Sequence, residues 1–593
     1  MMINSIKYFI LFFIFLCQKS YTQELTILHT NDLHSKLTGT GPAVEYSPMV
    51  INDDKTLGGF ARIATLFKQE KEKSPESTLI LDAGDFLMGS LFHTAEEETG
   101  FQLNMMKKMG YDCITLGNHE FEFGPETLSN ILKAAEKRGG FPQIVASNLV
   151  FSDKSVNDDE LQKFVSNGLI KPWIVINKNG LRIGIFGIMG IDAASVAPAS
   201  KPVLFSNPEK VAAKMAGYLK NQQNADVVIL LSHCGVQYNS ENKTYTGEDI
   251  ELAKKVPEID IIIGAHTHTR IPEFIKTGNT YIVQTGSYGT ELGKINMTFA
   301  NGKIETFKYE LIPVDDKIPG DSVVNGKIEE LTRYIDKKYL SPVDFSCNKI
   351  VGAGTFDLNI DFSNLKQSNL GQFVADASYY YLEKTGNSAD ISLVASGTIR
   401  ENLVSGFITV SDIFSVMSLG KGKDSIPGYP LAKIYLTGKE VKQMFEAVLK
   451  SREKGGDGYI YFSGAKIMID SDKRFMKKVQ KIEVGGKEID LSKKNKTLYS
   501  VSANTYLLSF ISRIKKMSFG LLKVTPKDKT GIQVTDINLQ LVDINSEKAG
   551  IQEAKEWISI VEFIKSFEKN GQGNHVIPDR YIKNNETLVD LAK

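Results

Sequence analysis

Short apolar runs that end abruptly in polar residues recur through the first half of the chain. Each run is a few residues long and is bounded by glycine or by polar side chains, which predicts a buried strand. Asp, Asn and His directly follow these runs, so the pattern also indicates where each strand ends. The five runs are Leu25–Leu28, Leu79–Leu81, Tyr111–Ile114, Val227–Leu231 and Ile261–Ile263.

Apolar residues at helical spacing lie between several of these runs. Phe60, Ile63 and Phe67 indicate one helix, and a second helix over residues 101–109 is expected to end at Gly110. The alternation of strands and helices predicts an α/β domain with β-sheets flanked by helices. Further strands are predicted at residues 143–146, 173–176, 182–188 and 282–284.

A polar segment at residues 315–321 predicts a domain boundary. Ile328, Leu331 and Ile335 then recur at helical spacing among charged residues, which predicts an amphipathic connecting helix. A second α/β domain should follow, with helices at 370–377 and 441–449 and strands at 391–394, 459–462, 498–501 and 538–542. The expected organisation is a layered α/β domain over 24–320, a linker helix over 321–345 and a second α/β domain over 346–593.

The first 23 residues follow a different pattern. Lys7 precedes the apolar run Tyr8–Leu16, and polar residues follow it, which is typical of a secretory signal peptide. The run is shorter than the roughly 20 residues that a transmembrane helix needs, and no later segment approaches that length. We therefore expect a secreted protein, periplasmic or at the cell surface, whose mature chain has no transmembrane segment. Cys17 directly after the run leaves a lipoprotein as an alternative.

Charge and cysteine content narrow the class of protein. Lys+Arg and Asp+Glu both number 70, and this balance argues against a partner that is a nucleic-acid polymer. Cys113, Cys234 and Cys347 are odd in number and far apart, so a disulfide framework is not expected. No pattern in the sequence indicates an oligomeric state.

Histidine is scarce in this chain and concentrated at the predicted strand ends. Of the eight histidines, five follow the apolar runs. A single strand-end histidine is usually a hydrogen-bonding loop residue, but five in matching positions indicate metal ligands. Imidazole suits Zn and similar ions, and carboxylate suits Mn and Mg. Because strand ends in an open α/β sheet meet at one crevice, we predict a site for two divalent metal ions, with Asp85 as the bridging carboxylate.

These motifs resemble those of the calcineurin-like metallophosphoesterase superfamily, which combines Asp-x-His, Gly-Asp, Gly-Asn-His-Glu, His and Gly-His-x-His segments. The fuller resemblance is to the secreted 5'-nucleotidase family. Its members join such a domain to a C-terminal substrate-binding domain, as in the bacterial periplasmic 5'-nucleotidase/UDP-sugar hydrolases. The resemblance extends over nearly the whole chain after the leader and is most specific in the first domain.

The resemblance implies a ligand set for each ion and a role for one further histidine. The ligands implied for one ion are Asp32, His34, Asp85 and His268, and those for the other are Asp85, Asn118, His233 and His266. His119 is implied to stabilise the transition state and to assist the leaving group. Glu122 stands where family members often have an Asp that orients this histidine, and it is longer by one methylene.

The second domain matches the family less closely. The family's Asn-x-Gly-x-x-Arg turn reads Ala395 to Arg400 here, so the Arg is present and the Asn is not. Lys366 stands in place of a second Arg and lacks the planar fork of a guanidinium. The family stacks the base between two Phe rings, and the corresponding positions are Leu419 and Tyr506. The resemblance therefore implies intact metal chemistry with altered nucleotide recognition.

We predict an exported phosphoric ester hydrolase that acts on a small-molecule phosphate ester, a nucleotide in the first instance, with metal-activated water. One alternative keeps this chemistry for a cyclic nucleotide, a sugar phosphate or a sulfur ester. An alternative from another class is a surface binding protein that keeps the fold without catalysis. The complete set of ligand motifs favours an enzyme, because a site that has lost catalysis is expected to lose ligands.

Overall fold

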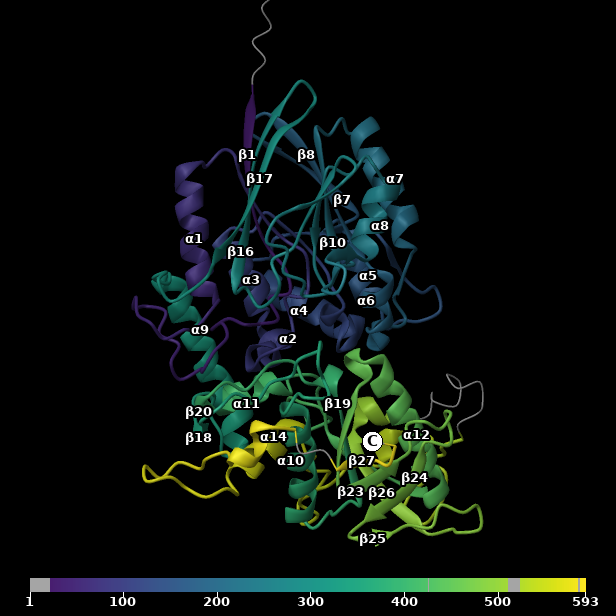
Figure 1. Cartoon of the computed structure of the whole chain (residues 1–593). Coiled ribbons are helices and arrows are strands. Elements are labelled where there is room, and N and C mark those ends of the chain that lie inside the picture. The colour runs from purple at the N-terminus through teal and green to yellow at the C-terminus, as the bar shows by residue number, and fades with distance from the viewer. Residues whose placement is uncertain (1–21, 425, 510–522, 585–586, 593) are drawn as a thin grey trace, which may run out of the picture.

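The computed structural model describes residues 22–424, 426–509, 523–584 and 587–592. Residues 1–21 of the expected signal peptide, including Cys17, lie outside the described residues. Figure 1 shows two domains, one above the other, with the helix α9 passing between them along one side. Among the described residues, no helix combines the length and apolar character that crossing a membrane would require.

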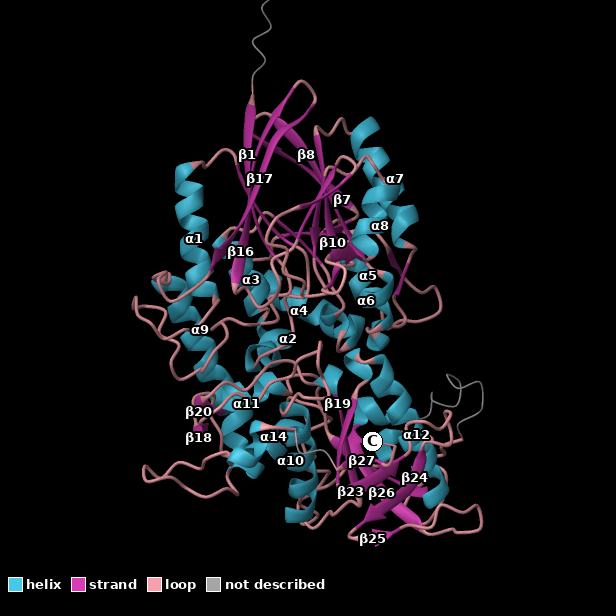
Figure 2. Cartoon of the chain, in the orientation of Figure 1, coloured by secondary structure: helices cyan, strands magenta, loops and turns pink. Residues whose placement is uncertain are grey.

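Two sheets form the centre of the first domain, and helices cover their outer faces (Figure 2). The first sheet is, in order, β17 (Lys303–Pro313), β16 (Glu291–Ala300), β1 (Gln23–Thr30), β2 (Thr78–Asp82), β3 (Cys113–Thr115), β4 (Gln143–Val145) and β6 (Ile170–Lys171). The second is β14 (Ile275–Thr277), β15 (Thr280–Val283), β13 (Ile261–Gly264), β10 (Val227–His233), β8 (Leu181–Met189) and β7 (Trp173–Lys178). All five apolar runs contain strands, as predicted.

The central strands are parallel and buried on both faces, which explains why they read as unbroken apolar runs. Ile27 of β1 and Ile229 of β10 lie in the core between the two sheets. Leu28, the next residue along β1, packs instead against the helices outside its sheet. These outer helices are α1 (Phe60–Lys73), α3 (Phe101–Met109) and α4 (Gly124–Arg138) on one side, and α7 (Pro208–Asn221) and α8 (Glu248–Lys255) on the other.

The predicted connecting helix is α9 (Ser322–Ile335), and Ile328, Leu331 and Ile335 lie on its buried face. Asp321 begins the helix by accepting hydrogen bonds from the first backbone N–H groups. The apolar cluster that covers the first sheet continues through α9 into the helices of the second domain. The two domains therefore share a buried apolar contact.

The second domain has two four-stranded sheets packed with helices. The first is β21 (Leu431–Thr437), β26 (Leu498–Asn504), β19 (Ile391–Ala395) and β22 (Ile460–Ser463), and the second is β25 (Lys487–Glu488), β24 (Val479–Val484), β23 (Ala465–Ile469) and β27 (Leu588–Asp590). A separate two-stranded antiparallel sheet pairs β18 (Ile350–Gly354) with β20 (Gly406–Thr409). The α-helices within its described residues are α10 (Leu370–Lys384), α11 (Val410–Val416), α12 (Gly438–Lys454) and α14 (Glu556–Ile564).

The strand predicted at 538–542 was wrong. Ile537–Leu539 instead form a single 3₁₀ turn. The carboxylate of Asp536 accepts a hydrogen bond from the N–H of Asn538, which favours a turn over an extended chain at this point. Leu541 still pairs with Ala432 of β21, but as an isolated bridge rather than as part of a strand.

Candidate active site

The end of β10 and the loops that follow β1, β2, β3 and β13 bring all seven predicted metal ligands together. Donor atoms in each of three groups lie within 4.8 Å of one another. The groups are Asp32, His34 and His268; His34, Asp85 and His119; and Asp85, His233 and His266. Because His34 and Asp85 each belong to two groups, the groups form one continuous cluster.

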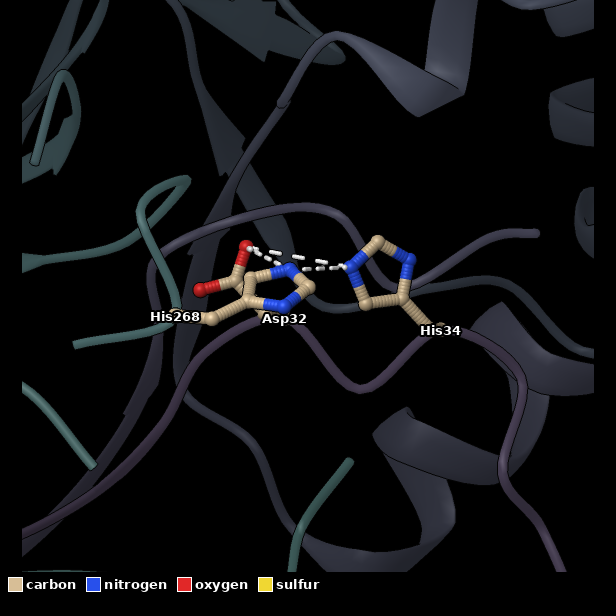
Figure 3. Close-up of side chains that lie close together, drawn as sticks. All are labelled: Asp32, His34 and His268. Carbon is tan, nitrogen blue, oxygen red and sulfur yellow. Dashed lines mark hydrogen bonds and ion pairs between the residues drawn. The ribbon is translucent and has the colours of Figure 1, made fainter. Parts of the chain in front are cut away.

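The side chains at one end of the cluster point toward one another (Figure 3). His34 Nε2 lies 2.9 Å from His268 Nε2. Asp32 Oδ1 lies 4.0 Å from the first of these nitrogens and 3.8 Å from the second. Asp32 is fully buried, and its carboxylate also accepts a hydrogen bond from Asn31 Nδ2 at 2.7 Å. This end of the cluster therefore offers two imidazole nitrogens and a carboxylate to one point.

The other end of the cluster is arranged around Asn118 and Asp85. Asn118 Oδ1 lies 3.1 Å from His233 Nε2 and 3.1 Å from His266 Nδ1. His233 Nε2 is also 3.1 Å from Asp85 Oδ2. The second oxygen of Asp85 accepts a hydrogen bond from the N–H of His119 at 2.8 Å. Asp85 thus lies between the two ends of the cluster.

Backbone carbonyl groups fix which nitrogen of two histidines faces the cluster. His34 Nδ1 lies 3.2 Å from the carbonyl oxygen of Leu87 and 3.0 Å from that of Met88. His233 Nδ1 lies 3.0 Å from the carbonyl oxygen of Ala83. Since a carbonyl oxygen can only accept, each Nδ1 carries a hydrogen, and Nε2 is the nitrogen of each ring that can give a lone pair to a metal ion. Metal-binding histidines require this arrangement.

The carboxylate of Asp192 holds Nε2 of His266, as the backbone carbonyl groups hold Nδ1 of His34 and His233. Sequence reasoning did not identify Asp192. Its Oδ2 lies 3.1 Å from His266 Nε2, and this hydrogen bond lowers the pKa of Asp192. His266 Nδ1 faces Asn118 and is the nitrogen that a metal ion could bind while Nε2 donates to Asp192. Glu248 holds Asp192 in place, because its carboxylate accepts the N–H groups of Ile191 and Asp192 at 2.9 and 3.0 Å.

Backbone conformation helps to aim the cluster's side chains. Five of its seven predicted ligands have a positive φ, which is uncommon for residues with a side chain and is best tolerated by Asp, Asn and His. Such conformations cost free energy and concentrate at functional sites. The five are Asp32 (50°), His34 (48°), Asp85 (57°), His266 (72°) and His268 (53°).

Glu120 joins two of the loops that carry the cluster. Its buried carboxylate accepts hydrogen bonds from the N–H groups of Asp85, Leu87 and Gly117 at 3.0, 2.9 and 2.6 Å. Gly117 has no room for a side chain, since a Cβ atom would lie 2.2 Å from Asp85 Oδ1. The Gly-Asp loop after β2 and the Gly-Asn-His-Glu loop after β3 are therefore held in fixed register.

The electrostatics of the cluster favour a positive charge. Burial opposes a charge on His233, but Asp85 and Asp32 outweigh it and raise the pKa of His233 to about 10. Burial likewise opposes ionisation of Asp85, and His233 and His119 nevertheless hold its pKa well below the usual range. Buried carboxylates, an amide oxygen and imidazole nitrogens converge on one another, and this donor set fits divalent cations.

His119, a member of one of the three donor groups, is paired with a carboxylate. Its Nδ1 is 3.1 Å from Glu122 Oε2, and its ring meets that of His34 edge-on with centroids 5.2 Å apart. Burial would raise the pKa of Glu122, but the contact with His119 lowers it below the usual value. The hydroxyl of Tyr429, in the second domain, donates a hydrogen bond to Glu122 Oε1 at 2.9 Å.

The positive charge of Arg400, a residue of the second domain, acts on the cluster. Burial is the main cause of the lowered pKa values of His34 and His268, and the charge of Arg400 lowers both further. The carbonyl oxygen of Arg400 accepts a hydrogen bond from the Tyr288 hydroxyl at 2.6 Å, and the Tyr288 ring lies 5.6 Å from each of these histidines. Arg400 and Tyr288 also line a cavity of about 930 Å³ between the domains.

The other three predicted substrate-binding residues are Lys366, Leu419 and Tyr506, and their surroundings differ from those of Arg400. Lys366 is exposed, and its backbone carbonyl accepts a hydrogen bond from Asn584. Leu419 is buried in the core, and its carbonyl accepts the N–H of Tyr429. Tyr506 stacks on Tyr429 with ring centroids 5.6 Å apart and planes 23° apart. The ring beside Tyr506 is therefore Tyr429, a residue that sequence reasoning missed.

Two family models match the chain: calcineurin-like phosphoesterase over residues 25–270 and 5'-nucleotidase, C-terminal domain over residues 349–512. The trifunctional nucleotide phosphoesterase protein YfkN of Bacillus subtilis is 27% identical over 74% of this chain, a match that spans 28% of YfkN. A 5'-nucleotidase of Vibrio cholerae is 26% identical over 79% of this chain and 82% of its own length.

A solved structure, the 5'-nucleotidase precursor from Thermus thermophilus, shares the fold with a TM-score of 0.67. It is 21% identical and covers 96% of this chain and 100% of its own. Together these matches define a two-domain phosphoric ester hydrolase. The chain belongs to the calcineurin-like phosphoesterases that carry a 5'-nucleotidase C-terminal domain.

Proposed function

We propose that this protein hydrolyses nucleotide phosphate esters with water at a centre for two divalent metal ions. The observation that carries the proposal is the single cluster in which ring nitrogens of His34, His233 and His266 face the same space as buried carboxylates. In this proposal, residues 24–320 hold the ions and residues 346–593 bind the substrate. One ion would be held by Asp32, His34, Asp85 and His268, and the other by Asp85, Asn118, His233 and His266.

Two ions such as Zn or Mn, when bound, supply an acidified water and neutralise charge on the phosphoryl oxygens. The chain's own residues supply the rest. Glu122 accepts a hydrogen bond from Nδ1 of His119, so Nε2 of His119 is directed at the cluster. There Nε2 would give a proton to the leaving oxygen. Arg400 adds positive charge beside the cluster and would attract the phosphate ester.

Nucleotides are the proposed substrates for two reasons. The relatives above are named as a nucleotide phosphoesterase and a 5'-nucleotidase. The second domain also places a stacked pair of rings, Tyr429 and Tyr506, so that the Tyr429 hydroxyl reaches Glu122, and stacking of a base on an aromatic ring contributes roughly 1–3 kcal/mol.

A substrate panel tests this proposal. The metal-loaded protein should release phosphate faster from AMP than from a cyclic nucleotide or a sugar phosphate, and it should not cleave a sulfur ester at a comparable rate. Rapid turnover of another ester with none of AMP would favour the alternative substrates. No turnover of any ester, with both ions bound, would favour a binding protein.

We also propose export, on the basis of the charged, apolar and polar order of the first 23 residues. Cell fractionation followed by N-terminal sequencing should find a chain that begins after residue 23 outside the cytoplasm. An acylated Cys17 at the mature N-terminus would instead identify a lipoprotein.

Removing the carboxylate of Asp192 is expected to weaken metal binding. Outer-shell partners of ligating histidines typically contribute about 10–100-fold in metal affinity. Asp192→Ala should therefore lower the affinity for one of the two ions by about that factor. Asp192→Asn, which keeps an oxygen acceptor for His266, should lower it less. Calorimetric titration of the metal-free protein with Zn²⁺ measures both effects.

Glu251→Gln is a matched control for Asp192, because it removes a carboxylate from an exposed site on α8 where Glu251 pairs with Lys254, away from the cluster. It should leave metal affinity unchanged. Equal affinity in Asp192→Ala and the native protein would contradict the role given to Asp192.

A further inference from the structure

The hydroxyl of Tyr429 crosses from the second domain to the first. It donates a hydrogen bond to Glu122 Oε1 at 2.9 Å, while Glu122 Oε2 faces His119 Nδ1 at 3.1 Å. The three side chains thus form a chain of hydrogen bonds that ends at the proposed metal centre. Glu122 and Tyr429 are separated by 307 residues in sequence, so this contact depends on how the two domains are placed.

The loop that carries Tyr429 is held firmly by its own domain. The N–H of Tyr429 donates to the carbonyl of Leu419 at 2.9 Å, and the indole N–H of Trp557 donates to the carbonyl of Pro427 at 2.8 Å. Gly428 lies against the Trp557 ring, where a Cβ atom would be 2.5 Å from Cδ1. These contacts leave the backbone of Tyr429 little freedom.

A group of buried charged side chains contacts the same loop. Lys555 is fully buried, and its Nζ lies 2.8 Å from Asp424 and 2.5 Å from Glu553. Glu553 also accepts the N–H of Lys423 at 2.9 Å. Breaking a buried pair of this kind is strongly destabilising, because it leaves an uncompensated charge. Lys423 and Asp424 are therefore tied to Glu553 and Lys555 near the segment that carries Tyr429.

The ring of Tyr429 is also fixed. Tyr506 stacks on it. Gly420 makes room for it, since a Cβ atom there would lie 2.2 Å from Tyr429 Cδ1. The position of the hydroxyl is therefore set by the second domain, whereas its acceptor, Glu122, belongs to the first.

Glu122 has a particular need for this second contact. A Glu side chain has one more rotatable bond than an Asp and loses more conformational entropy when it is ordered. With only His119 as a partner, the carboxylate of Glu122 could rotate away. With one oxygen held by the Tyr429 hydroxyl and the other by His119, both the carboxylate and the imidazole are oriented.

We propose that Tyr429 is a positioning residue: its hydroxyl orients Glu122, and through it His119, so that the second domain completes the catalytic pair of the first. The proposal rests on the proposed role of His119. Proton transfer by His119 then depends on the placement of the second domain. This dependence is separate from any role of that domain in binding the substrate.

The test is Tyr429→Phe, which removes the hydroxyl and keeps the ring. A hydrogen bond to a charged group is worth enough that its loss should lower kcat by about tenfold. KM for AMP should stay within about twofold, and metal content should not change. Tyr435→Phe, which removes a hydroxyl from β21 of the same domain, is the control and should keep the native kcat. Thermal unfolding of both variants verifies the fold.

Double variants separate a positioning role from other roles. In the Glu122→Gln background, Tyr429→Phe should lower kcat by less than about twofold, because the two residues act as one unit. A tenfold loss that persists in that background would overturn the proposal, as would a native kcat in Tyr429→Phe or a change confined to KM.

If His119→Ala kept its activity, the proposed function itself would fail. Loss of activity in His119→Ala with a native kcat in Tyr429→Phe would overturn this inference alone.

Discussion

Replacing His119 with alanine is expected to lower kcat by about two to four orders of magnitude, the usual contribution of a positioned general acid. The metal content should stay at the native level, because Nδ1 of His119 is committed to Glu122 and none of the seven proposed ligands is removed. Steady-state phosphate release from AMP, with elemental analysis of the same sample, measures both quantities.

His575→Asn is a suitable control for this variant, because it removes an imidazole from the second domain whose Nδ1 bonds to the carbonyl of Phe567. It should retain native kcat and metal content. Native activity in His119→Ala would contradict the role of His119. Loss of metal in that variant would instead indicate that His119 is itself a ligand.

Replacing Asp85 with asparagine should have the largest effect of all. Asp85 is shared by two of the three donor groups, so the variant removes the charge that both ions need. Two-metal catalysis contributes several kcal/mol of transition-state stabilisation, and kcat should therefore fall more than about a thousandfold. Elemental analysis should find fewer than two ions per chain.

Asp153→Asn controls for the loss of one carboxylate from the first domain, because Asp153 is exposed in the loop after β5 (Leu149–Val150). This control should bind metal as the native protein does. If Asp85→Asn kept two ions and native activity, Asp85 could not be the bridge. Circular dichroism of the apo proteins distinguishes loss of metal from loss of fold.

The sequence predicted the first domain well because its central strands are buried on both faces. A strand such as β10 then reads as a continuous apolar run, and Ser232 and His233 at its carboxyl end mark where the strand stops. The exposed edges of the second domain do not read as continuous apolar runs. At 538–542 the β-like composition was overridden by Asp536, whose side chain favours a local turn.

The proposed ligands could be found from sequence because their chemistry is in the residue types themselves. The groups that orient them could not. Asp192 lies 74 residues from His266, and Tyr429 lies 307 residues from Glu122, and neither belongs to a motif. Folding alone brings each pair within hydrogen-bonding distance. Gly420 leaves space for the Tyr429 ring, but a glycine in the sequence does not reveal which ring fills the space beside it.

The most direct measurement is anomalous X-ray scattering from crystals of the protein loaded with Zn²⁺ or Mn²⁺. Our account predicts two peaks per chain, both within bonding distance of the Asp85 carboxylate. One peak should also contact His34 and His268, and the other His233 and His266. A single peak, or peaks that do not share Asp85, would contradict the two-ion centre on which the proposed hydrolysis depends.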